Sequence, residues 1–277
     1  MDAREKQRQK TIWQLIAIGL VLIVGLLIIV IPRRADEPNG NGTEGKRMVS
    51  VPLSGETLGP LMLTASALEA DEVARVTADT VPLGWYAGVS YTVADASLRA
   101  QPTVALALER MLLAYTSTNA SYTTPIVTGA YTVGAASDSI YAGGYTVELS
   151  LMVPSGDEMA TVPLSGSLAA TFRAWLVSHA AYYGFAITGT GTLRYVGTPH
   201  AAYLFSQSVS LADYVALLMT KTQKAPLVVE TGGVYYDIFF VKAEDGRATV
   251  KLTEGAAFTA SGTNAGGFIV TVIRSSK

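Results

Sequence analysis

The longest apolar run in the chain is TIWQLIAIGLVLIVGLLIIVI, from Thr11 to Ile31, and it contains no charged residue. A helix rises about 1.5 Å per residue, so roughly 20 such residues can cross the ~30 Å hydrocarbon core of a membrane. The main alternative is a cleaved signal peptide, whose apolar region has about 7–15 residues and ends at a small-residue cleavage site. This run ends in IPRR. The pattern therefore predicts an uncleaved transmembrane helix over residues 11–32.

The sequence beyond this run becomes polar. Residues 33–50 are rich in Gly, Asn, Pro and charged residues, which predicts a flexible linker. Basic residues flank the apolar run on both sides, so charge alone decides little about its orientation. A short basic tail followed by a large domain fits a cytoplasmic segment over residues 1–10 and a C-terminal domain outside the cell membrane.

Three segments in the rest of the chain follow the helical period. Ala96–Tyr115 repeats apolar side chains at i, i+4, i+7 and i+8, and Pro102 suits the start of a helix. A second helix is predicted over Ser165–Tyr183, where Gly184 provides the C-terminal cap, and a third over Ser210–Met219. The apolar stripe of the first helix is typical of core packing and not of a ligand-binding face.

Other segments follow the pattern of β-strands. Leu58–Thr64 and Thr124–Thr132 combine β-branched and apolar residues between Gly and Pro. Leu227–Ile273 alternates polar and apolar residues around turn signals at Asp245-Gly246 and Gly266-Gly267, which predicts three or four antiparallel strands. Helices and strands that are segregated in this way predict an α+β fold with an all-β C-terminal appendage.

The composition is that of a globular protein: of 277 residues, 49% are hydrophobic and 15% charged. The formal net charge is −2, and removing residues 1–47 leaves 12 of the 20 basic and 17 of the 22 acidic side chains. This negative balance argues against nucleic acid as a partner. The chain has no cysteine, which excludes a disulfide scaffold and thiolate chemistry.

Three further segments, between Phe172 and Tyr214, are WLVSHAAYYGF, LRYVGTPHA and SLADY. They resemble the VanY-type D-alanyl-D-alanine carboxypeptidases, which are zinc peptidases of the M15B family. The resemblance implies a VanY/M15-like domain of the hedgehog/D,D-peptidase type, with a central antiparallel sheet, over residues 51–222. It also implies a β-rich appendage over residues 223–277, because the closing SGTNAGGFIVTV is similar to the end of an appendage in some members.

In that family two histidines and an aspartate hold zinc, a glutamate is the general base, and an arginine binds the carboxylate of the terminal D-alanine. The resemblance places Tyr141, Glu148 and Thr192 at the ligand positions. It places Gly189 at the general base and Tyr131 at the arginine. Threonine is a poor zinc ligand, glycine cannot accept a proton, and tyrosine carries no positive charge. The resemblance therefore implies a degenerate member that retains no zinc ligands and binds no cofactor.

The other chemically versatile side chains carry weaker signals. His179 and His200 fall on framework positions of the resemblance and not on ligand positions, so a structural role is expected for both. Asp138, Asp157 and Glu158 lie near Glu148 in the sequence, but paired carboxylates on a hairpin are usually solvated. No serine-nucleophile motif, P-loop or dinucleotide-binding motif is present.

Three functions remain open at this point. The first is a single-pass protein of the cell membrane, anchored by residues 11–32, whose inactive peptidase domain binds a peptidoglycan stem peptide or a cell-envelope protein through the former active-site cleft. Tyr131, Tyr141 and Thr192 are expected to line that cleft. The second is an active zinc carboxypeptidase with an atypical metal site centred on Glu148. The third is a structural subunit of a membrane complex.

Overall fold

The computed structural model describes residues 47–54, 63, 74, 76–88, 90–119 and 123–274. The predicted tail 1–10, the predicted span 11–32 and most of the predicted linker 33–50 lie outside the described residues, as does nearly all of the predicted strand Leu58–Thr64. Among the described residues, no single helix is long and apolar enough to cross a membrane. Two consecutive helices, Thr198–Gln207 and Leu211–Met219, reach that length and hydropathy together, but they are bent by 111°.

The larger sheet is mixed and mainly antiparallel. Its strands follow the order β3-β5-β6-β9-β8, and β7 pairs with the far end of β6. Only β3 and β5 run parallel among these pairs. The strands are β3 (Thr92–Val93), β5 (Thr124–Gly129), β6 (Thr146–Ser155), β7 (Glu158–Pro163), β8 (Phe185–Ile187) and β9 (Thr192–Tyr195).

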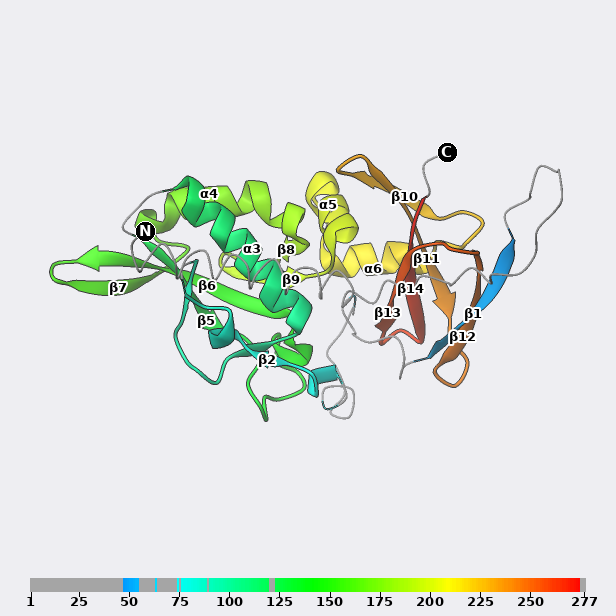
Figure 1. Ribbon diagram of the computed structural model, residues 1–277, viewed down its shortest axis with the longest axis horizontal. Helices are drawn as coiled ribbons and strands as arrows, with labels where there is room; N and C mark the ends of the chain where they lie inside the picture. The colour runs from blue at the N-terminus through cyan, green and yellow to red at the C-terminus, as the bar shows by residue number, and fades with distance from the viewer. Residues whose placement is uncertain are drawn as a thin grey trace, which may run out of the picture.

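Two helices, α3 (Pro102–Thr118) and α4 (Ala170–His179), cover one face of this sheet (Figure 1). Alternation along β6 sends Val147, Leu149 and Leu151 into the core beneath these helices. The intervening residues Thr146, Glu148 and Ser150 therefore lie on the opposite, polar face. This alternation separates a hydrophobic layer from the face that carries Glu148.

The predicted helices of this half are confirmed, with shifted ends. Helix α3 begins at Pro102 and not at Ala96, because proline fits the first turn, where its missing N–H is not needed. The preceding Arg99–Ala100 forms β4, which pairs with β2 (Val81–Pro82). Short 3₁₀ turns precede and follow α4, and the second of them ends at Gly184 with φ of 84°, as the predicted cap requires.

The C-terminal half contains two helices and two small sheets. Helix α6 (Leu211–Met219) begins at the predicted cap Ser210, whose hydroxyl accepts from the Asp213 N–H, whereas α5 (Thr198–Gln207) was not predicted. The four-stranded sheet has the order β10-β11-β14-β13, and β12 pairs with β1. The strands are β1 (Met48–Ser54), β10 (Leu227–Thr231), β11 (Val234–Lys242), β12 (Arg247–Thr253), β13 (Phe258–Thr263) and β14 (Gly267–Ile273).

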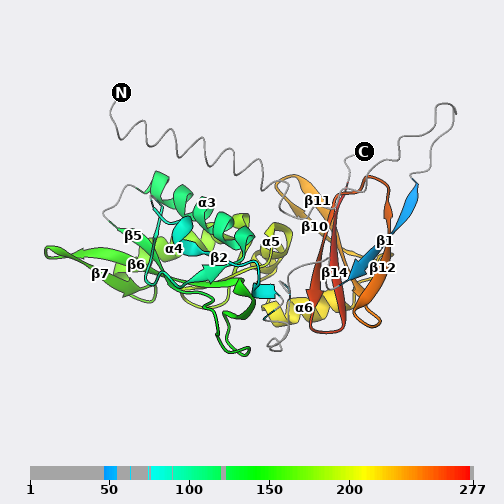
Figure 2. The ribbon, with the colours of Figure 1, turned by 60° about the horizontal axis from the view of Figure 1, so that its bottom comes forward.

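Strand β1 belongs to a different part of the fold from the one predicted for its residues. Residues 48–50 were assigned to the linker and 51–54 to the peptidase-like domain, but all of them pair with β12 in the C-terminal half. Figure 2 shows β1 and β12 beside the C-terminal sheet. The reason is that Val51 and Leu53 alternate with polar residues and pack against Phe239 and Phe258. The β appendage is therefore built from both ends of the described chain.

Candidate functional site

The candidate site lies on the polar face of the larger sheet, around Glu148. Strand β6 pairs with β5 on one side and β9 on the other, so Glu148 lies opposite Gly129 and Thr192 in the register. Tyr141 comes from the loop between β5 and β6, and its hydroxyl donates a hydrogen bond of 2.6 Å to Oε2 of Glu148. The structure thus brings together Tyr141, Glu148 and Thr192, the three positions at which the resemblance places zinc ligands.

Gly129 makes room for this hydrogen bond. A Cβ atom at Gly129 would lie 2.7 Å from the Tyr141 hydroxyl and 3.1 Å from Cβ of Glu148. Contacts this short would displace the tyrosine ring, since real Cβ atoms essentially never approach other atoms to 2.7 Å. The absence of a side chain at Gly129 is therefore a condition for the contact between Tyr141 and Glu148.

The environment of Tyr141 keeps its phenol protonated. Partial burial, the hydrogen bond to Glu148 and the charge of Glu148 together raise the pKa of Tyr141 to about 12. At neutral pH the tyrosine is therefore a hydrogen-bond donor and the carboxylate is its acceptor.

The turn between β8 and β9 carries the general-base position, Gly189. The N–H groups of Thr188 and Gly189 donate to the carbonyl of Thr192 at 2.9 and 3.3 Å. A Cβ atom at Gly189 would lie 3.0 Å from the Thr192 hydroxyl oxygen, so the two positions are immediate neighbours. The turn therefore brings position 189 to the site, but position 189 supplies no side chain to accept a proton.

Tyr131 does not line an open cleft, contrary to the expectation from the sequence. Its side chain is only 6% exposed and packs with Val76 and Ala142. The Arg99 N–H donates to the Tyr131 carbonyl at 2.8 Å, and the Arg99 guanidinium hydrogen-bonds to Thr80. The tyrosine ring packs in this small cluster because removing its apolar surface from water is favourable.

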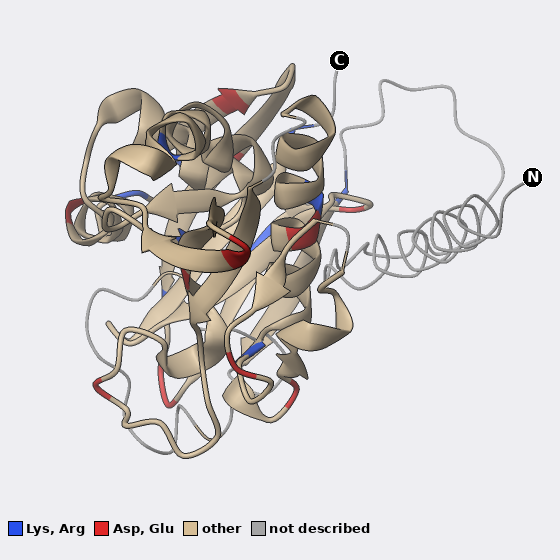
Figure 3. Ribbon diagram, turned by 90° about the vertical axis from the view of Figure 1, so that its left-hand side faces the viewer, with Lys and Arg blue, Asp and Glu red and all other residues tan. Residues whose placement is uncertain are grey.

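The donor atoms at this site do not fit zinc. Zinc sites use thiolate, imidazole and carboxylate ligands, whereas Tyr141 and Thr192 offer a neutral phenol and an alcohol beside one carboxylate. Among the described residues, no three or more His, Cys, Asp or Glu side chains lie close enough together to hold a metal ion. Figure 3 shows the acidic residues at separate places on the ribbon. Glu158 pairs with Ser155, seven residues along β6 from Glu148, so roughly 20 Å separates the two carboxylate positions.

Both histidines have structural surroundings, as expected of framework positions. His200 is 3% exposed, with Nδ1 2.9 Å from the Tyr214 hydroxyl and Nε2 3.0 Å from the Thr271 hydroxyl. Burial lowers the pKa of His200 to about 3, so the ring is neutral and joins α5 to α6 and β14. His179 is half-buried, and its ring stacks on Trp175 with centroids 4.4 Å apart.

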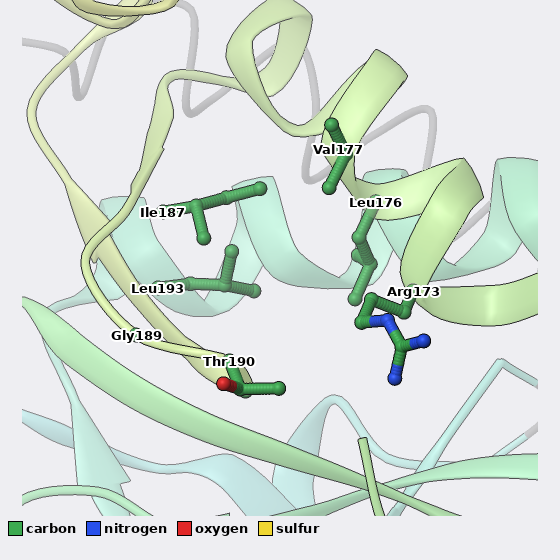
Figure 4. A pocket seen from close by; sticks show the side chains of 8 residues that line it. Arg173, Leu176, Val177, Ile187, Gly189, Thr190 and Leu193 are labelled. Carbon is green, nitrogen blue, oxygen red and sulfur yellow. The ribbon is translucent and has the colours of Figure 1, made fainter. Parts of the chain in front are cut away.

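Two of the cavities in the described part of the chain are not lined by Tyr141, Glu148 or Thr192. One, of about 160 Å³, lies between α4 and the β8–β9 turn (Figure 4). The other, of about 320 Å³, is lined by residues from the end of α3, from β6 and from the start of α4.

No protein-family model matches the sequence, and no curated protein matches it significantly. Among solved structures, the chain is similar to the vancomycin-resistance D,D-dipeptidase VanXYg, with 21% sequence identity and a TM-score of 0.61. The match covers 82% of this chain and 100% of VanXYg. The LD-carboxypeptidase LdcB aligns over 59% of this chain and 96% of its own, with 15% identity and a TM-score of 0.39.

The similarity to VanXYg extends over more of the chain than the predicted peptidase-like domain. Residues 51–222 number 172 of 277, or about 62% of the chain, so a match over 82% extends beyond them. The similarity is therefore not limited to the predicted peptidase-like domain. It confirms that the chain has the D,D-peptidase type of fold expected from the sequence.

Proposed function

We propose that this protein is a catalytically inactive, D,D-carboxypeptidase-like protein of the cell envelope. The face around Glu148 binds a peptidoglycan stem peptide or a cell-envelope protein. The observation that carries the proposal is the 2.6 Å hydrogen bond between Tyr141 and Glu148, because it joins two positions where the resemblance expects zinc ligands. A carboxylate that accepts a short hydrogen bond from a protonated phenol is held in place as a recognition group.

Catalytic inactivity is proposed from the identities of Thr192 and Gly189, the described positions at which the resemblance expects a zinc ligand and the general base. A zinc peptidase needs ligands that hold the ion and a base that takes a proton from the attacking water. The hydroxyl oxygen of Thr192 is a much weaker zinc ligand than an imidazole nitrogen. Gly189 has no side chain, so it cannot act as the base. Among the described residues, no group of three or more His, Cys, Asp or Glu side chains could hold a metal ion in their place.

Binding without hydrolysis remains compatible with the same residues. Tyr141, Glu148 and Thr192 are all half-buried and present an aromatic ring, a carboxylate and a hydroxyl group to one small area. An aromatic ring with a polar edge can pack on a peptide while neighbouring polar groups fix its orientation. The structure of VanXYg is a complex with a D-Ala-D-Ala phosphinate analogue, which supports a D-alanyl peptide as the ligand class to test.

We also propose that the protein is anchored in the cell membrane. Residues 11–32 anchor the protein in the cell membrane in a single pass, residues 1–10 lie in the cytoplasm, and the folded part lies outside. Its support is the uncharged run of Thr11–Ile31 in the sequence. Peptidoglycan would then be within reach of the folded part.

A sedimentation assay with cell-wall sacculi tests the proposal. The full chain in mild detergent is incubated with purified sacculi, with and without zinc, and the pelleted fraction is measured. We expect pelleting that does not depend on zinc and that falls at least tenfold in Tyr141→Ala. The matched control is Tyr182→Ala, at a tyrosine that is 69% exposed on a different surface. Zinc-dependent release of D-alanine that is lost in Glu148→Ala would instead establish the active carboxypeptidase.

The third function, a structural subunit of a membrane complex, has a different outcome in the same assay. No pelleting with sacculi, together with a membrane protein recovered by crosslinking, would support this function over the first.

A further inference from the structure

A small, partly open cavity on the helix-covered side of the sheet is lined by aliphatic side chains and one arginine. Helix α4 forms one wall and the β8–β9 hairpin forms the other, and the volume is about 160 Å³. Figure 4 shows Leu176 and Val177 of α4 facing Ile187 and Leu193 of the hairpin, with Arg173 and Thr190 at one end. Gly189 and Gly191 of the turn complete the lining.

This cavity is separate from the face around Glu148. Leu176 and Leu193 belong to the buried core beneath the helices, whereas Thr192 alternates with Leu193 and points to the other face. The two sites share only the turn of Gly189, so binding in the cavity does not depend on the proposed function.

The walls of the cavity are aliphatic and partly open to solvent. Leu176 and Leu193 are buried at its base, while Val177 and Ile187 are 49% and 42% exposed at its rim. Branched side chains that are left exposed on both sides of a hollow favour an aliphatic occupant, because its burial removes their surface from water. The space corresponds to about five water molecules at roughly 30 Å³ each, so the occupant is a small group.

Arg173 is the charged residue at this cavity. Its Nη1 donates to the carbonyl of Leu164, which fixes the guanidinium at the end of the hollow. No carboxylate among the described residues forms an ion pair with it. A guanidinium held in one orientation matches a carboxylate, which can accept two parallel hydrogen bonds from it.

We propose that this cavity binds a small branched aliphatic carboxylate, with its alkyl group between Val177 and Ile187 and its carboxylate on Arg173. The ligand is a short-chain acid or the C-terminal residue of a peptide that ends in a small aliphatic side chain. Both share the same chemistry at the cavity. A cationic ligand is excluded by the charge of Arg173, and a sugar is disfavoured because aliphatic walls offer its hydroxyl groups few partners.

Calorimetric titration of the full chain in detergent tests this site. The probes are isobutyrate, its uncharged analogue isobutyramide, N-acetyl-glycyl-valine and the C-terminal amide of that peptide. We expect isobutyrate, the acetylated peptide acid, or both to bind, and each corresponding amide to bind at least tenfold more weakly. If the peptide acid binds at least tenfold more tightly than isobutyrate, the natural ligand is a chain end; otherwise it is the free acid.

Two variants and a control locate the binding. Arg173→Gln removes the charge, and Val177→Phe fills the hollow from its exposed rim while it leaves Arg173 intact. Each is expected to weaken carboxylate binding at least tenfold, with thermal unfolding measured to confirm that both variants fold. Arg247→Gln, at an exposed arginine of β12, is expected to leave the Kd unchanged. Equal binding of acid and amide, unchanged binding by Arg173→Gln and Val177→Phe, or no binding of either acid would overturn the proposal.

Discussion

The hydroxyl of Tyr141 lies 2.6 Å from Oε2 of Glu148, and this hydrogen bond fastens the loop between β5 and β6 to the polar face of the sheet. Seven residues separate the two in sequence, and the loop reaches the sheet through a 3₁₀ turn at Ala142–Gly144. Gly129 and Thr192 flank Glu148 on the neighbouring strands. A ligand or ion that uses Glu148 must therefore share it with Tyr141 or displace that residue.

Replacing Tyr141 by Phe should lower the free energy of unfolding by about 1 kcal/mol, because Glu148 loses a donor while the ring stays in place. Urea denaturation at pH 7 measures the change. The matched control is Tyr182→Phe, at an exposed tyrosine whose hydroxyl makes no hydrogen bond to a described residue. An equal cost for the two variants would contradict a stabilising role for the bond.

The same hydrogen bond predicts a stability change at alkaline pH. The folded protein raises the pKa of Tyr141 from 10 to about 12, so the folded state holds this proton more tightly than the unfolded state. The resulting stability is fully present below pH 10 and is lost as the pH rises from 10 to about 12. The difference in unfolding free energy between the wild type and Tyr141→Phe should therefore shrink across this range. A constant difference would show that Tyr141 does not titrate in this way.

Gly129→Ala should destabilise the fold by about 1–3 kcal/mol, because the added Cβ overlaps the Tyr141 hydroxyl. Tyr141→Ala removes the ring that Cβ would meet. In the double variant, the cost of Gly129→Ala should therefore be smaller than in the wild type, and a double-mutant cycle of unfolding free energies measures this coupling. If the two changes in unfolding free energy simply add, the added Cβ atom does not act through Tyr141, and a contact with another residue such as Glu148 causes the strain.

Local signals in the sequence predicted most of the helices and turns. Ser210 caps α6 and Gly184 ends the turn after α4, because caps depend on residues within one helical turn. Asp245 and Gly246 both have positive φ, as the predicted hairpin turn requires. Helix α5 was missed, although Pro199 in its first turn was a usable signal, because its sequence overlaps the motif on which the resemblance rests.

Long-range pairings could not be predicted from the same signals. Val51 pairs with Val250, and nothing in the short β1 segment identifies a partner so distant in the sequence. At the site, the resemblance predicted which positions converge. It did not predict that Tyr141 would bond directly to Glu148, because this depends on the space that Gly129 leaves. The burial of Tyr131 likewise depends on Val76, which the sequence does not place beside it.

His200 should contribute to stability mainly at neutral pH. His200→Leu leaves the hydroxyls of Tyr214 and Thr271 without their imidazole partner and should cost about 1–3 kcal/mol at pH 7. The folded pKa of about 3 lies below the ordinary value of 6.5, so this contribution is present above pH 6.5 and is lost as the pH falls toward 3. The difference in unfolding free energy between wild type and variant should therefore shrink as the pH falls below 6.5. A pH-independent gap, or an equal loss in His179→Leu at pH 7, would contradict this role.

Zinc binding should appear when imidazoles are placed beside Glu148. In Tyr141→His/Thr192→His, two imidazoles and one carboxylate would face one point, which is the ligand number of a catalytic zinc site with an open position. We expect zinc to raise the Tm of this double variant and to leave that of the wild type unchanged, because a phenol and an alcohol bind zinc poorly. The control Tyr182→His/Thr220→His adds two histidines on separate elements and should show no response. Addition of Glu148→Ala to the first variant should abolish the effect. A zinc-dependent rise in the wild-type Tm of the same size would mean that Tyr141, Glu148 and Thr192 already hold the metal, and the protein would then have to be reconsidered as an active peptidase.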